Sequence, residues 1–161
     1  MNGRFALALL VSAVALATAP RALADTSAPV APGYHVPEFT ATGVDGATRR
    51  VTYAKGSATV LFFFLSSCPT CHKMLPEWNR AYQRRPKNVN VVGVLLDRAP
   101  AAFFEAYPVA FPVVQSPGRE FLQAYKVSRT PTTLRVAAGG KVESHGVGVL
   151  DPISLGEYFR P

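Results

Sequence analysis

Residues Thr59–Leu65 (TVLFFFL) form an apolar, β-branched and aromatic run that ends directly before the sequence SSCPTC at residues 66–71. A run of this length and composition predicts a strand that is buried on both faces of a sheet. The serines end the strand, and Pro69 suits the first turn of a helix that we expect to reach about Arg84. The sequence therefore predicts that both cysteines lie at a strand-to-helix junction.

Cys68 and Cys71 are the only cysteines of the 161-residue chain. A bridge between them would close almost no loop, so it would remove little entropy from the unfolded chain. Two sulfurs on one helical turn can instead switch between dithiol and disulfide with little movement of the backbone. We therefore interpret the pair as redox-active and not as a structural disulfide that stabilises the fold.

The predicted helix gives the two cysteines different roles. The Cys68 sulfur would face the unpaired N–H groups and the positive dipole end of the helix, which favour the thiolate. Cys71 lies one turn further in and should be more shielded. We expect Cys68 to attack a substrate disulfide and Cys71 to resolve the mixed disulfide. Pro69, Thr70 and His72 are candidate modulators, and His72 would add positive charge near the pair.

The N-terminus has the pattern of a secretory signal peptide over residues 1–24. Arg4 precedes an apolar run at residues 5–19, and Ala22-Leu23-Ala24 offers a cleavage site. The run is short for a bilayer span, which needs roughly 20 residues; an uncleaved membrane anchor is the alternative. Cleavage would lower the net charge from +7 to +5 and would place the protein in the periplasm. In an oxidising compartment, a close cysteine pair is disulfide-bonded unless something reduces it.

The remaining sequence predicts a flexible leader at residues 25–36 and one domain at residues 37–161. A turn signal at Asp45-Gly46 predicts an N-terminal β-hairpin. The other predicted elements are strands at 88–96, 132–136 and 141–147, and helices at 100–107, 119–125 and 152–159. This order of strands and helices, ending in a hairpin, indicates an α/β fold with three layers and a mixed central sheet.

The combination of a strand, CPTC, a helix and then Thr130-Pro131 before a strand resembles the thioredoxin superfamily. Within that superfamily the chain is similar to the exported TlpA/ResA-like thiol–disulfide oxidoreductases. The resemblance implies a thioredoxin-like domain with an N-terminal hairpin. It also implies that Thr130 and Pro131 form a cis-proline loop against the cysteines, with the backbone of Thr130 open to a substrate strand. It implies protein disulfides as clients, of the cytochrome c maturation or copper-site assembly type, and a membrane thiol as electron donor.

In relatives, an acidic side chain accepts the proton of the buried thiol. The chain has no acid at either of the two positions where the family carries one. Phe62 stands where thioredoxins carry a buried acid, and Met74 stands where ResA-like proteins often have a glutamate. Glu77, one turn beyond Met74, is a candidate substitute, and a surface position is the other interpretation of this residue.

Other functions use the same residues. A disulfide-donating oxidant and a copper-binding chaperone both remain alternatives. We predict no metal site and no cofactor, because zinc needs two further ligands and the three histidines stand alone in the sequence. A peroxidatic cysteine would need a proline and a hydroxyl where the chain has Leu61 and Leu65. The basic residues are scattered without interleaved aromatic residues, so we expect no nucleic-acid partner.

Overall fold

The computed structural model describes residues 30–161. The predicted signal peptide lies outside the described residues. The structure comprises strands β1 (Phe39–Thr42), β2 (Thr48–Val51), β3 (Ala58–Phe64), β4 (Val89–Leu95), β5 (Val113–Gln115), β6 (Thr132–Val136) and β7 (Val142–Val147), and helices α1 (Pro69–Arg84), α2 (Phe103–Ala106), α3 (Arg119–Ala124) and α4 (Pro152–Gly156). Short 3₁₀ turns, Ala138–Gly140 and Glu157–Phe159, follow β6 and α4.

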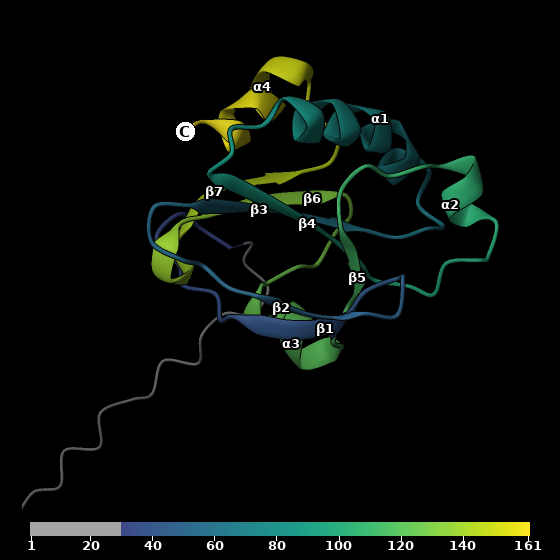
Figure 1. Cartoon of the computed structure of the whole chain (residues 1–161), viewed down its shortest axis with the longest axis horizontal. Coiled ribbons are helices and arrows are strands. Elements are labelled where there is room, and N and C mark those ends of the chain that lie inside the picture. Colours follow the sequence, from purple (N-terminus) through teal and green to yellow (C-terminus); the bar gives the residue numbers. More distant parts are fainter. Residues whose placement is uncertain (1–29) are drawn as a thin grey trace, which may run out of the picture.

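Five strands form one mixed sheet in the order β5-β4-β3-β6-β7, and β1 and β2 pair as a separate antiparallel hairpin. The strand β3 is central: it pairs in parallel with β4 and antiparallel with β6. Helices α1 and α4 cover one face of the sheet, and α3 and the hairpin lie on the other (Figure 1). This arrangement confirms the predicted three-layer α/β fold with a mixed sheet and an N-terminal hairpin.

All seven residues of β3 are buried, and its apolar side chains divide between the two faces of the sheet. Phe62 packs toward α1, where its ring stacks on Trp78 with centroids 4.5 Å apart. Phe63 packs on the opposite side, against Phe121 and Tyr125 of the α3 segment. The sheet therefore needs cover on both sides, and the prediction that this strand is buried on both faces is confirmed.

Most predicted elements match within one or two residues, but two helices are shorter than their sequence pattern indicated. The region 100–107 contains only the four-residue helix α2, and the closing helix at 152–159 gives way to a 3₁₀ turn after Gly156. Two residues that precede the predicted domain start at residue 37 form backbone hydrogen bonds with the region around the start of β7. Gly33 N–H donates to Val142 O at 2.8 Å, and Val36 N–H donates to Gly140 O at 2.8 Å.

Candidate redox site

Cys68 is the N-cap residue of α1, and Pro69 occupies the first turn. The Cys68 Sγ accepts a hydrogen bond from the backbone N–H of Cys71 at 3.2 Å. A sulfur at this position thus takes the place of the oxygen that usually caps a helix. The local sequence explains the geometry, because proline pre-organises the helix start and has no N–H of its own to leave unpaired there.

The two sulfurs differ in exposure and in acidity. Cys68 is partly exposed, whereas Cys71 is fully buried, and both are free thiols in this structure. Partial burial alone would raise the pKa of the Cys68 thiol, but hydrogen bonds to the sulfur, first of all from Cys71, hold this pKa below its usual value. Burial and the neighbouring Cys68 sulfur raise the pKa of the Cys71 thiol to about 12. This asymmetry matches an exposed attacking thiolate in front of a shielded resolving thiol.

The Thr130–Pro131 peptide bond is cis, as the resemblance implied. The carbonyl oxygen of Thr130 lies 4.0 Å from the Cys68 Sγ. Pro131 is buried, and its carbonyl accepts a hydrogen bond from Gly148 N–H at 2.8 Å. The fold therefore brings together the first cysteine, the proline loop and the segment that follows β7, although they lie far apart in the sequence.

The remaining candidate modulators lie in different surroundings. Thr70 is exposed on the first turn of α1. The Nε2 atom of His72 lies 2.8 Å from the carbonyl oxygen of Ser66, and its ring stacks on Tyr107. His72 therefore contacts the loop that leads into the helix, and no hydrogen bond between its ring and either sulfur occurs within residues 30–161.

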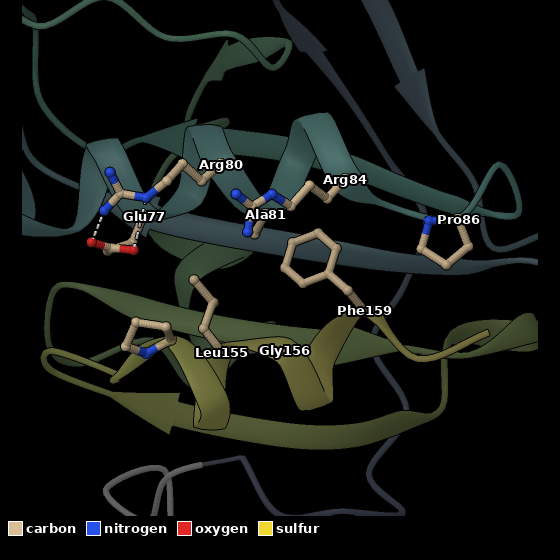
Figure 2. A pocket seen from close by; sticks show the side chains of 9 residues that line it. Glu77, Arg80, Ala81, Arg84, Pro86, Leu155, Gly156 and Phe159 are labelled. Atoms are coloured by element: carbon tan, nitrogen blue, oxygen red, sulfur yellow. Dashed lines mark hydrogen bonds and ion pairs between the residues drawn. The ribbon is translucent and has the colours of Figure 1, made fainter.

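Glu77 pairs with Arg80 and makes no hydrogen bond to either cysteine among residues 30–161. Its carboxylate forms an ion pair with Arg80, and both residues line a pocket of about 620 Å³ between α1 and the C-terminal segment (Figure 2). In Figure 2, Leu155 and Phe159 face α1 across this pocket, and the dashed lines run only from Glu77 to Arg80. Phe62 and Met74, at the two family positions for an acid, are fully buried. In the part of the chain that the structure describes, no carboxylate is hydrogen-bonded to Cys71.

Asp97 is the site residue that the sequence did not predict. Its carboxylate accepts hydrogen bonds from Ser66 and Ser67, the two residues directly before Cys68. One signal was available: Asp97 follows the second predicted core strand, and the carboxyl ends of parallel strands meet at one edge of a sheet. Among the described residues, no group of three His, Cys, Asp or Glu side chains is arranged to hold a metal ion.

No helix within residues 30–161 has the length and apolar character that a membrane span requires.

Comparison with known proteins agrees with this geometry. Residues 32–145 match the AhpC/TSA family. The chain is 29% identical over 135 residues to the thiol–disulfide oxidoreductase ResA of Bacillus subtilis, covering 81% of this chain and 75% of ResA. It is 29% identical over 111 residues to the sporulation thiol–disulfide oxidoreductase A of the same organism, covering 65% and 67%.

The crystal structure of StoA from Bacillus subtilis superposes with a TM-score of 0.67 at 25% identity, covering 79% of this chain and 99% of StoA. The shared fold extends over nearly the whole length of that protein. Together with the family match and the two cysteines at the start of α1, it identifies the activity. The chain belongs to the AhpC/TSA family of thioredoxin-fold proteins and is a thiol–disulfide oxidoreductase of the ResA/StoA type.

Proposed function

We propose that this protein is an exported, periplasmic reductase of protein disulfides, with Cys68 as the attacking residue and Cys71 as the resolving residue. The observation that carries the proposal is the position of the Cys68 Sγ, partly exposed at the N-terminus of α1 and 3.2 Å from the Cys71 N–H. The signal-peptide pattern at residues 1–24 supports export.

In the proposed reaction, the Cys68 thiolate attacks one sulfur of a client disulfide. The client S–S bond breaks, a Cys68–client disulfide forms and the other client sulfur leaves as a thiolate. Cys71 then attacks the Cys68 Sγ, which forms the Cys68–Cys71 disulfide and releases the second client thiolate. Two electrons pass from the cysteine pair to the client, and the protons of the pair pass to the client thiolates or to water. A membrane dithiol donor would restore the reduced pair.

An apolar surface beside the proline loop supports a protein client. Three of the four exposed large apolar side chains in residues 30–161, Val147, Val149 and Ile153, lie between the end of β7 and α4. Val147 pairs with Thr132, directly after Pro131. Val149 follows Gly148, whose N–H binds Pro131 O, so Val147 and Val149 lie beside the proline loop, where exposed apolar groups suit contact with a protein chain. The resemblance to TlpA/ResA-like proteins suggests clients in cytochrome c maturation or copper-site assembly.

The reduction potential tests the direction of the reaction. The mature protein would be equilibrated in defined thiol buffers, and the Cys68–Cys71 pair followed by the mass shift after alkylation. A potential near that of thioredoxin, about −270 mV, supports the reductase. A potential near −120 mV would instead assign the protein to disulfide donation, for which the lowered pKa of Cys68 is the supporting observation.

Export is tested separately by cell fractionation of the full chain and by N-terminal sequencing of the product. A periplasmic product that begins at Asp25 supports cleavage after Ala24. A product that retains residues 1–24 and is found in the membrane fraction would show instead that the protein is anchored by an uncleaved segment.

A further inference from the structure

Ser66 and Ser67 form a tight turn between β3 and α1. The turn is closed by a hydrogen bond from Cys68 N–H to Leu65 O at 3.3 Å. Because Cys68 is both the last residue of this turn and the N-cap of α1, the conformation of the turn decides where the sulfur lies relative to the helix N–H groups.

The carboxylate of Asp97 accepts four hydrogen bonds from the two central residues of this turn. Ser66 donates its N–H to Oδ1 at 2.8 Å and its hydroxyl to Oδ2 at 2.9 Å. Ser67 donates its N–H and its hydroxyl to Oδ2, both at 3.2 Å. Hydrogen bonds to a charged acceptor are stronger than neutral ones, so this one side chain binds both central residues of the turn strongly. Partial burial alone would raise the pKa of Asp97, but these hydrogen bonds hold it below its usual value and keep the acceptor charged.

Asp97 is itself held firmly by the sheet. The preceding residue, Leu96, donates its N–H to Phe64 O at 2.9 Å and so extends the pairing of β3 with β4. The side-chain amide of Gln115 on β5 donates to the carbonyl oxygens of Leu95 and Asp97, both at 2.9 Å. Because the backbone around Asp97 is fixed to β3 and β5, its carboxylate holds the Ser66–Ser67 turn at a fixed position relative to the sheet.

Helix α1 and the segment around α2 hold the same turn from the other side. The Nε2 atom of His72 lies 2.8 Å from Ser66 O. The ring of His72 stacks on that of Tyr107, just beyond α2, with centroids 4.1 Å apart. Ser66 is buried, and its N–H, its hydroxyl and its carbonyl each have a hydrogen-bonding partner, either Asp97 or His72.

We propose that Asp97 is a positioning residue for Cys68: by holding the Ser66–Ser67 turn, it keeps the Cys68 Sγ at the N-terminus of α1, where the helix N–H groups stabilise the thiolate. The inference rests on the proposed role of Cys68 as the attacking residue. It adds a long-range determinant of reactivity that lies 29 residues beyond the first cysteine and outside the CPTC sequence.

Charge and position act in opposite directions on the Cys68 thiolate, which makes the inference testable. Removal of a nearby negative charge by itself favours the thiolate and would lower the midpoint of its titration. Loss of the held turn would move the sulfur away from the helix N–H groups and would raise that midpoint. The direction of the shift in Asp97→Asn therefore separates positioning from a purely electrostatic effect.

The test measures the rate of iodoacetamide alkylation of the reduced protein against pH, with the alkyl group assigned to Cys68 by mass spectrometry. We expect Asp97→Asn to raise the midpoint by about half a pH unit or more and to slow alkylation about threefold or more below the midpoint. Ser66→Ala keeps the carboxylate and loses one of the four hydrogen bonds, so it should shift the midpoint in the same direction by less.

Asp45→Asn is the matched control, because Asp45 also binds a backbone N–H in a turn but lies in the exposed β1–β2 connection. Its midpoint should equal that of the wild type. Circular dichroism would check that each variant folds. If Asp97→Asn does not fold, the direction of the midpoint shift in Ser66→Ala alone tests the inference. A midpoint that falls or stays unchanged overturns the inference.

The same measurement keeps this inference separate from the proposed function. If the wild-type Cys68 titrates no lower than an ordinary thiol, the proposed role of Cys68 fails whatever Asp97 does. If the wild-type midpoint is low and the Asp97→Asn midpoint does not rise, the role of Cys68 stands and the role of Asp97 fails.

Discussion

The Cys68 Sγ accepts the N–H of Cys71 at 3.2 Å, so the residue that we propose attacks a disulfide is also the N-cap of the helix that carries its partner. Deprotonation of the sulfur strengthens this hydrogen bond, because a charged acceptor binds an N–H more tightly than a neutral one. Helix capping and thiolate stabilisation are therefore one interaction in this protein.

Replacement of Cys68 should separate capping from chemistry. Cys68→Ser retains a good N-cap and should unfold near the wild-type denaturant midpoint of the reduced protein, whereas Cys68→Ala should lose about 1 kcal/mol of stability. Both variants should lack disulfide reductase activity. Urea unfolding under reducing conditions would measure the difference, and equal stability of the two variants would argue against a capping role for the sulfur.

Replacement of Cys71 should trap the reaction halfway. Cys71→Ser keeps the backbone N–H that faces Cys68, but it lacks the sulfur that we propose resolves the mixed disulfide. We expect a stable Cys68–client disulfide that migrates as a larger species on non-reducing gels and disappears on reduction. The double variant Cys68→Ser, Cys71→Ser is the control and should form no such species; a trapped species in this variant would assign the attack to another group.

Phe62 should contribute strongly to stability although it occupies a position where thioredoxins carry an acid. It is fully buried and stacks on Trp78, so Phe62→Ala should cost about 3–5 kcal/mol. Ile153→Ala is the control: this side chain is 82% exposed, and its loss should change the free energy of unfolding by about 0.5 kcal/mol or less. Urea unfolding would test both values.

Because of His145, the free energy of unfolding should be lower in mild acid than at neutral pH. Burial lowers the pKa of His145 below 6.5, so the unfolded chain binds a proton that the folded protein does not. The stability contributed by the neutral ring is therefore complete above pH 6.5 and is lost as the pH falls. Urea midpoints between pH 8 and pH 5 should decline less in His145→Gln than in the wild type. Ser144→Ala, which removes no titrating group, should keep the wild-type decline.

The exposed apolar side chains between the end of β7 and α4 should matter for protein clients and not for the sulfur chemistry. Val149 is 56% exposed, and it follows Gly148, whose N–H binds Pro131 O. Val149→Ser and Ile153→Ser should each raise KM for a protein disulfide about threefold or more, since each removes apolar contact area. Reduction of a small aromatic disulfide should keep its wild-type rate; an equal loss with both substrates would contradict the assignment.

Local sequence patterns determined much of this protein. The length and composition of residues 59–65 predicted the buried strand, and Pro69 predicted the start of α1. Both follow from short-range rules, since strand burial and helix initiation depend on neighbouring residues. The spacing of Cys68 and Cys71 likewise predicted a redox pair with two unequal sulfurs. The role of Thr130 and Pro131 came only from the family resemblance.

Tertiary structure alone decided which distant residues meet at the pair. Glu77 turned out to pair with Arg80, and Asp97 reached the turn before Cys68 from the end of a neighbouring strand. These contacts depend on strand order and on the side toward which each side chain packs, and no local pattern specifies either. The sequence by itself determined that two sulfurs stand at the start of a helix, whereas the packing of β3, β4 and β6 decided which groups surround them.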